Sequence, residues 1–322
     1  MISAFEQRHL KDQRYAIVLQ LGVLLFILAG LFSTMVWQPR TPSPDKIVDL
    51  NSVPVNNNDS AAIMNAMNDI DIRAESAIVW DVKNQTVLYT KNADAVLPLA
   101  SITKLMTAML AYELIAGDTR TTVSLKAIQQ EGSSGLVEGE ALTIEKLSQL
   151  ALISSSNDAA YELAASAGKL LGESDPTAQF IRGMNIRAEE LGLDSLNFRN
   201  TTGLDLSLYE PSAVGSARDV SLLLEHILQE YPEILDPTRK ASARIYNSNG
   251  TYHDVVNTNE AILAIPNLLA TKTGYTDLAG GNLTIAFDAG LNRPIIITVL
   301  GSTKDARFSD VLTLTKAVQE NI

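Results

Sequence analysis

Ser101 and Lys104 are the residues whose types and spacing most directly suggest chemistry. Three positions apart on a helix, they lie on the same face about one turn from each other. A serine hydroxyl placed in this way acts as a nucleophile when the lysine is neutral and accepts its proton, and burial beside a second cation favours the neutral lysine. The same spacing recurs at Ser43–Lys46 and Ser166–Lys169. It also suits a helix cap followed by a surface lysine, so the pair alone leaves both interpretations open.

A second candidate group is Ser155-Ser156-Asn157, which lies between two predicted helices. A short loop at this point can direct the hydroxyl of Ser155 and the amide of Asn157 into a cleft. The same residues suit an N-cap for the helix that begins near Asp158. Ser195-Leu196-Asn197 has the same form, so this triplet is not specific by itself.

The third candidate group is Lys272-Thr273-Gly274, which occurs once and leads into the last strands. The lysine offers a point charge for a carboxylate and the threonine a hydroxyl donor, while the glycine lets a substrate backbone approach an edge strand. A turn at the entry to a strand has a similar composition. The three groups together, in this order on helix, loop and strand, are far less expected by chance than any one of them.

The elements that must position these groups follow from the hydrophobic period. Runs rich in β-branched residues predict strands early and late in the domain, and apolar residues at i, i+3 and i+4 predict helices between them. The predicted strands are Ala77–Asp81, Val87–Thr90, Leu283–Phe287 and Ile295–Leu300; the predicted helices are Ile102–Leu110, Leu142–Ile153, Asp158–Ala167, Ala178–Leu191, Ala217–Leu228 and a last one from Ala306. These patterns predict an α/β (α+β) fold in which a sheet is flanked by helices and a helical block is inserted between early and late strands.

The composition excludes several classes of function. The net charge of −12 opposes binding to nucleic acid, and the absence of cysteine removes thiolate nucleophiles and cysteine-based metal sites. The three histidines, His9, His226 and His253, lack the spacing of metal ligands, and only His253 falls in a loop-like setting. A serine enzyme here therefore needs a base other than histidine, and we expect no metal and no cofactor.

The N-terminal part predicts an attachment to a membrane. Residues 15–37 carry no charge and are long enough to cross about 30 Å of hydrocarbon, so they predict an uncleaved transmembrane anchor. Basic residues on both sides favour a cytoplasmic segment 1–14 only weakly. Residues 38–70 are rich in proline and asparagine and predict a flexible linker, which leaves 71–322 as the catalytic domain.

The motifs and their surroundings resemble the D-alanyl-D-alanine carboxypeptidases, the low-molecular-mass penicillin-binding proteins within the penicillin-recognising serine peptidases. The resemblance covers the chain from about Ala74 to the C-terminus. The stretches that carry it are Leu99–Thr107, Ser156–Ala160, Met184-Asn185, Glu190–Gly192, Asn200–Leu204, Ser216–Asp219 and Lys272–Asp277. It implies a β-lactamase/DD-peptidase-like fold with an antiparallel sheet.

The resemblance also implies roles for the candidate catalytic residues. Ser101 is the acylated nucleophile and Lys104 its base. Ser155 relays a proton to or from the leaving amine. Asn157 positions Lys104 and the substrate amide.

For substrate binding, the resemblance implies that Lys272 and Thr273 hold the substrate carboxylate, next to Gly274. The backbone N–H groups of Ser101 and Tyr275 form the oxyanion hole. The acyl-enzyme then reacts with water, and no cofactor takes part.

The expected activity is removal of the terminal D-alanine from peptidoglycan stem pentapeptides, with β-lactams as covalent inhibitors. Cleavage of cross-links by a DD-endopeptidase uses the same chemistry and stays open, as does a non-catalytic module that binds β-lactam or wall. A β-lactamase is disfavoured because Leu193 stands where the class A deacylation motif has glutamate. The catalytic domain is expected outside the cell membrane, held by one span; the sequence leaves oligomeric state and stem composition open.

Overall fold

The computed structural model describes residues 63–67, 69–132, 134–172 and 174–322. The chain divides into two units, Met1–Lys46 and Ile47–Ile322, and every described residue belongs to the second. The predicted cytoplasmic segment, the membrane anchor and most of the linker lie outside the described residues. Residues 63–67, at the end of the predicted linker, are helical, with Ile63 and Met67 buried. In the part of the chain that is described, no helix combines the length and apolar character needed to cross a membrane.

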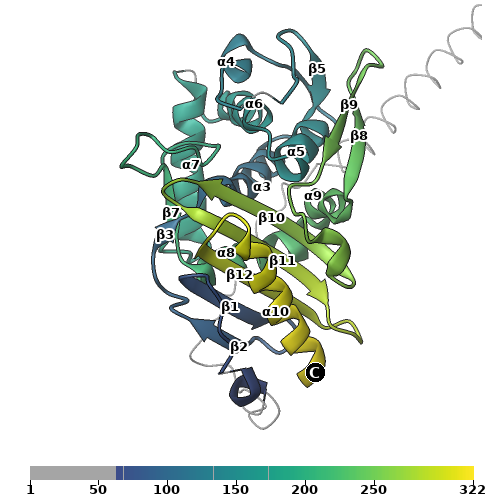
Figure 1. Ribbon diagram of the computed structural model, residues 1–322. Coiled ribbons are helices and arrows are strands. Elements are labelled where there is room, and N and C mark those ends of the chain that lie inside the picture. The colour runs from purple at the N-terminus through teal and green to yellow at the C-terminus, as the bar shows by residue number, and fades with distance from the viewer. Residues whose placement is uncertain (1–62, 68, 133, 173) are drawn as a thin grey trace, which may run out of the picture. The chain divides into compact units, whose positions relative to one another are not determined.

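A five-stranded sheet forms the centre of the second unit, in the order β10-β11-β12-β1-β2 (Figure 1). Every neighbouring pair in it is antiparallel, as expected from the resemblance. The early strands therefore pair directly with the late ones, across most of the domain sequence. The strands are β1 (Ser76–Asp81), β2 (Thr86–Lys91), β10 (Leu268–Thr276), β11 (Gly280–Asp288) and β12 (Pro294–Ser302).

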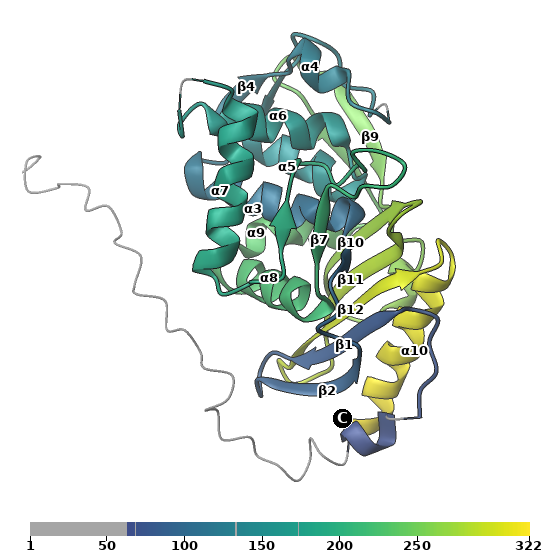
Figure 2. The same ribbon diagram turned by 90° about the vertical axis from the view of Figure 1, so that its left-hand side faces the viewer.

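Both faces of this sheet are covered, because alternate residues of each strand point to opposite sides. Ile78 and Trp80 join the core on the side of α8 (Ala217–Glu230), whereas Ala77 and Val79 join the core on the side of α10 (Ala306–Asn321). Figure 2 shows α10 on one side of the sheet and the helical block on the other. The sequences of β1 and β12 are consequently nearly continuous apolar runs.

The inserted helical block carries both serines, Ser101 in η1 and Ser155 in the loop between α5 and α6. Besides α8, its helices are η1 (Ala100–Thr103), α3 (Lys104–Leu114), α4 (Leu125–Ile128), α5 (Ile144–Ile153), α6 (Asn157–Gly168), α7 (Pro176–Glu190), α9 (Pro232–Leu235) and η2 (Asp236–Arg239). The short helix η3 (Ile262–Ala264) instead contributes Ile262 to the core on the side of α10. Side chains cap several helices of the block: Ser156 accepts a hydrogen bond from Ala159 N at the start of α6, and Ser216 accepts one from Asp219 N at the start of α8.

Several short strands were not predicted from the sequence. They are β3 (Leu97–Pro98), β4 (Arg120–Thr122), β5 (Ala141–Thr143), β6 (Asn197–Phe198), β7 (Ala213–Gly215), β8 (Ser242–Tyr246) and β9 (Tyr252–Val256). Strands of two to five residues carry almost no period of their own, and partners such as Leu97 and Gly215 are far apart in the chain. One expectation is corrected here: His253 lies in β9 rather than in a loop. Lys272 lies within β10, which agrees with the strand position expected for the third group rather than with a turn at its entry.

Candidate active site

Ser101 and Lys104 meet at the junction of η1 and α3. The Nζ atom of Lys104 lies 2.8 Å from Ser101 Oγ and donates a second hydrogen bond, 2.7 Å long, to the carbonyl oxygen of Thr202. Lys104 is completely buried, while Ser101 is partly exposed at the surface of the site. The hydroxyl is thus open to a substrate, and the amine behind it is shielded from water.

The protonation state of Lys104 follows from its surroundings. Burial lowers its pKa well below the ordinary value, and the positive charge of Lys272 lowers it further. Its two hydrogen-bond partners are a hydroxyl and a carbonyl, neither of which carries a charge. Both the burial and the uncharged partners disfavour the protonated form of Lys104, which is the direction that a general base requires.

The nucleophile segment is held in an unusual backbone conformation. Ala100, just before Ser101, has a φ of 48°, which is sparsely populated for residues with a side chain. Gly203 packs against it so closely that a Cβ on Gly203 would lie 1.9 Å from Ala100 O. Thr103 Oγ1 also donates a 2.7 Å hydrogen bond to Ala100 O. The surrounding loop therefore fixes this strained turn, as is common at functional sites.

Ser155 approaches the same region from the loop between α5 and α6. Its φ of 61° is again positive, and its Oγ accepts a 2.9 Å hydrogen bond from Lys272 Nζ. Lys272 also donates to the carbonyl oxygen of Thr273, at 2.8 Å. The buried amine of Lys272 thereby links the loop that carries Ser155 to strand β10.

Lys272 is almost fully buried, with 1% of its surface exposed. Burial lowers its pKa to about 7, and the positive charge of Arg307 adds to this effect. Arg307, at the start of α10, donates a 2.7 Å hydrogen bond from Nη1 to the carbonyl oxygen of Gly274. Lys272 and Arg307 therefore place basic side chains together beside Gly274, which suits an anionic ligand.

Asn157 does not take the position expected for it. Its Nδ2 donates a 2.7 Å hydrogen bond to the carbonyl oxygen of Glu131, and among the described residues no hydrogen bond joins it to Lys104. Its Oδ1 is buried without a hydrogen-bond partner in the described structure. Such an unsatisfied acceptor is costly unless a ligand completes it.

The third motif borders the nucleophile directly. A Cβ on Gly274 would lie 2.8 Å from Leu99 O and 3.2 Å from the backbone nitrogen of Ser101, so only glycine lets β10 come this close. Thr273 is buried, and its hydroxyl lies 2.5 Å from that of Thr258. Tyr275 follows on the strand, and its own side chain is exposed and bonded to Asp277.

Two residues that hold the site were missed by the sequence analysis. Asn282 on β11 is fully buried and donates from Nδ2 to Pro98 O and Leu99 O, which ties the nucleophile segment to the sheet. Arg307 was included only in the last predicted helix. No local spacing links either residue to Ser101 or Lys272.

The motif repeats lie apart from this cluster. Ser166 bonds to Thr121 and Glu162, while Lys169 is exposed. Ser195 bonds to Asp219 beside α8. Ser43–Lys46 lies outside the described residues.

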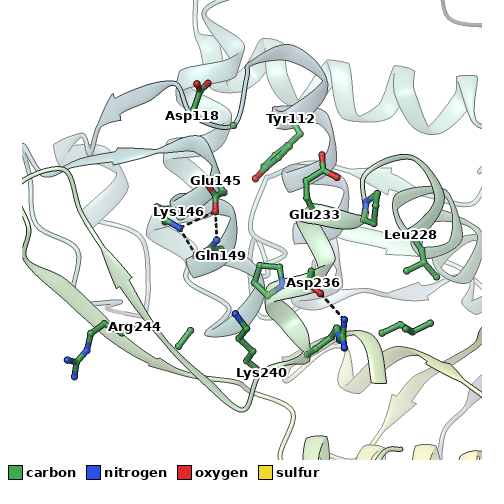
Figure 3. A pocket seen from close by; sticks show the side chains of 16 residues that line it. Tyr112, Asp118, Glu145, Lys146, Gln149, Leu228, Glu233, Asp236, Lys240 and Arg244 are labelled. Carbon is green, nitrogen blue, oxygen red and sulfur yellow. Dashed lines mark hydrogen bonds and ion pairs between the residues drawn. The ribbon is translucent and has the colours of Figure 1, made fainter. Parts of the chain in front are cut away.

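A cavity of about 1140 Å³ lies elsewhere in the domain, and none of the candidate site residues lines it. Figure 3 shows Tyr112, Asp118 and Glu233 along one side, with Lys240 and Arg244 along the other. Within the described part of the chain, no three His, Asp or Glu side chains gather closely enough to hold a metal ion.

Comparison with known families decides the classification. The family described as D-alanyl-D-alanine carboxypeptidase matches residues 62–304, which is most of the chain. The protein belongs to the D-alanyl-D-alanine carboxypeptidase family. The match includes all three motifs and the elements that carry them, so the resemblance inferred from the sequence is confirmed.

Individual members of the D-alanyl-D-alanine carboxypeptidase family are moderately similar. The D-alanyl-D-alanine carboxypeptidase DacF of Bacillus subtilis is 30% identical over 244 residues, which cover 74% of this chain and only 60% of DacF. A D-alanyl-D-alanine endopeptidase of Escherichia coli is 31% identical over 258 residues, covering 76% of each protein. A relative named as a carboxypeptidase and one named as an endopeptidase are thus similar to this chain to almost the same degree.

A solved structure supports the fold. The ampicillin-bound crystal structure of penicillin-binding protein D2 from Listeria monocytogenes is 29% identical and has a TM-score of 0.64. The similarity covers 78% of this chain and 98% of that one. The β-lactamase/DD-peptidase-like arrangement expected from the motifs is therefore confirmed for the described domain.

Proposed function

We propose that the protein is a serine-type D-Ala-D-Ala carboxypeptidase, which removes the terminal D-alanine from peptidoglycan stem pentapeptides through an acyl-enzyme. The observation that carries this proposal is the contact between Ser101 and the fully buried Lys104, at 2.8 Å. Family membership supplies the substrate class, and this contact supplies the chemistry. β-Lactams are expected to acylate the same hydroxyl.

The acylation step uses Ser101, Lys104 and Ser155. Lys104 takes the proton of Ser101 as Oγ attacks the carbonyl of the penultimate D-alanine. The backbone N–H groups of Ser101 and Tyr275 stabilise the oxyanion, because they lie on adjoining segments that Gly274 brings together. Ser155, bonded to Lys272, passes a proton to the leaving amine of D-alanine.

Substrate binding uses Lys272 and Thr273 together with the side-chain amide of Asn157. Lys272 and Thr273 bind the terminal carboxylate, in a field that the Arg307 cation strengthens. Asn157 Oδ1, which has no partner among the described residues, accepts the N–H of a substrate amide. Once D-alanine leaves, water enters and Lys104 serves again as base for deacylation.

The location is part of the same proposal. Peptidoglycan lies outside the cytoplasmic membrane, so residues 15–37 anchor the protein as a single span and the linker residues before Ile63 lift the domain away from it. Protease treatment of intact spheroplasts tests this: an extracytoplasmic domain is digested, whereas a cytoplasmic one is protected.

The second candidate is a DD-endopeptidase, favoured by the 31% identity to the Escherichia coli enzyme. Mass spectrometry of free pentapeptides and cross-linked dimers, incubated with the full-length protein and with Ser101→Ala, separates the two. Ser101-dependent loss of one alanine from pentapeptides supports the carboxypeptidase. Dimers split into monomers make endopeptidase the better description, and no Ser101-dependent change contradicts both.

A further inference from the structure

The hairpin of β8 and β9 has one face packed on the domain and one face open. Ile245 and Val255 are buried, whereas the alternate positions are exposed. Two tyrosines stand on the open face, Tyr246 with 53% and Tyr252 with 49% of their surface exposed. Exposed aromatic residues are a recurrent sign of a binding surface.

The open face is ordered by contacts across the two strands. Tyr246 and Tyr252 are directly opposite in the register, with ring centroids 5.7 Å apart. The Arg244 guanidinium lies 3.9 Å from the Tyr252 ring centroid and is held by two hydrogen bonds to Asp254, at 2.7 and 2.9 Å. We call these four residues, Arg244, Tyr246, Tyr252 and Asp254, the tyrosine platform.

The hairpin is fixed to the domain near its tip. His253 Nε2 lies 2.6 Å from the buried Glu140 carboxylate, which also accepts a 2.8 Å hydrogen bond from Asn247 Nδ2. Ser248 N donates to Ala141 O at 2.8 Å. The platform is therefore held in place before any ligand arrives, which lowers the entropic cost of binding.

The other end of the hairpin enters the candidate active site. Thr258, two residues after β9, lies with its hydroxyl 2.5 Å from that of Thr273, and its N–H donates to Ile153 O at 3.1 Å. Tyr252 precedes Thr258 by six positions, so it lies at most about 20 Å from it at ~3.3 Å per residue. A ligand joined to the substrate can reach both places.

We propose that the tyrosine platform binds an uncharged sugar ring of the glycan strand to which the stem peptide is attached. The proposal rests on the proposed function and adds a second contact with the same substrate. An extended stem of five residues spans at most about 17 Å. An extended stem bound at Ser101 can therefore place its sugar at a distance comparable to the length of the hairpin.

The chemistry of the platform matches a pyranose ring. The exposed parts of the two rings, which exclude the Tyr252 face under Arg244, cover the C–H groups of a sugar. The phenol hydroxyls and the Arg244–Asp254 pair form hydrogen bonds with its hydroxyl and acetamido groups. Because the charges of Arg244 and Asp254 cancel, the platform favours an uncharged ligand over a polyanion. The two tyrosines also stabilise the hairpin as a cross-strand pair, and the test must separate that contribution.

The test compares two substrates with the full-length protein. One is a glycan strand carrying uncross-linked pentapeptides, and the other is a synthetic peptide ending in D-Ala-D-Ala without sugar. For the double variant Tyr246→Ser/Tyr252→Ser we expect KM for the glycan-linked substrate to rise about tenfold, the loss of one good aromatic contact. KM for the sugar-free peptide should stay within about twofold, the range of an indirect surface change.

Two controls define the result. Tyr246→Phe/Tyr252→Phe keeps both rings and should retain most of the preference for the glycan-linked substrate, and Val256→Ser alters the same open face outside the platform. An equal rise in KM for both substrates would mean that the tyrosines only support the hairpin and would overturn the proposal. So would an unchanged KM for both.

A direct binding experiment keeps this inference separate from the proposed function. Peptide-free glycan strands are titrated into the Ser101→Ala protein while the tyrosine ring resonances are followed by NMR. Shifts of the ring resonances assigned to Tyr246 and Tyr252 support the platform even if no D-alanine is released by the wild type. Shifts confined to other tyrosines, or no shifts at all, overturn it.

Discussion

Two regions of this domain hold basic side chains in very different ways. At the candidate active site, Lys104 and Lys272 are 0% and 1% exposed, and no described carboxylate pairs with either of them. At the cavity of Figure 3, Lys146 is paired with Glu145 at 3.1 Å, with 32% and 45% of their side chains exposed. Lys146 at the cavity is thus paired and partly exposed to solvent, whereas Lys104 and Lys272 at the candidate active site are buried.

The difference shows where the molecule accepts a cost in stability. Burying an amine without an anion disfavours its charged form, which is why the pKa of both site lysines falls. Nothing in packing requires a lysine at either position. The buried amines are therefore best explained by the chemistry that they allow, as a base at Lys104 and as a titratable anion contact at Lys272.

The largest effect is expected at Lys104. Lys104→Met fills the same space without a basic nitrogen, so the rate of acylation by a fluorescent penicillin should fall about 10³-fold, as for other general bases. Lys169→Ala, in the repeat of the motif, should leave that rate unchanged. If Lys104→Met is acylated at the wild-type rate, the buried amine is not the base.

Next in size is the effect of Gly203→Ala. The new Cβ would lie 1.9 Å from Ala100 O, so the strained turn before Ser101 must move, and we expect a loss of about 2–4 kcal/mol in unfolding free energy with slower acylation. Gly250→Ala is the matched control, because Gly250 has a similar φ of 84° but no atom within 4 Å of the added Cβ. Equal losses in urea unfolding would show that backbone strain alone, and not the close approach, matters.

A smaller effect is expected on the pH dependence. The positive charge of Lys272 helps to lower the pKa of Lys104, so Lys272→Met should raise that pKa. Acylation at saturating benzylpenicillin rises with pH as Lys104 loses its proton, and in the variant this rise should move to higher pH. Saturation separates the effect from weaker carboxylate binding. A rise that stays in place, or moves to lower pH, would show that the two amines do not interact.

The smallest effects are expected at the cavity. Arg239→Ala breaks the exposed pair with Asp236, at 2.8 Å, and should change the unfolding free energy by less than about 1 kcal/mol. Acylation by penicillin should be unaffected. A slowing of acylation in this variant would mean that the cavity and the site are coupled.

The sequence predicted the elements better than the contacts between them. Long strands and helices with a clear period, such as β12 and α8, were predicted nearly to their ends. The hairpin of β8 and β9 was not, because its short strands alternate exposed tyrosine and charge with only two fully buried positions. Its existence depends on tertiary contacts such as His253 with Glu140.

For the site, the spacing of Ser101 and Lys104 allowed their contact but left the helix-cap interpretation open, and the structure joins the two residues across the junction of η1 and α3. The contact of Lys272 with Ser155 spans 117 positions and was not predicted; the family resemblance implied only that both residues belong to one site. Neither spacing nor resemblance predicted the roles of Asn282 and Arg307. Each side chain donates to backbone carbonyl oxygens, which every residue has, so no residue type marks the partner in the sequence. The orientation of Asn157 toward Glu131 depends on a loop whose path the sequence does not reveal.

The most direct test of the central claim is mass spectrometry of the intact protein and its peptides after exposure to benzylpenicillin. The account predicts one adduct per chain, on the peptide that contains Ser101, and none in Ser101→Ala. An adduct on another residue, or one that persists in Ser101→Ala, would contradict the assignment of Ser101 as nucleophile and of Lys104 as its base.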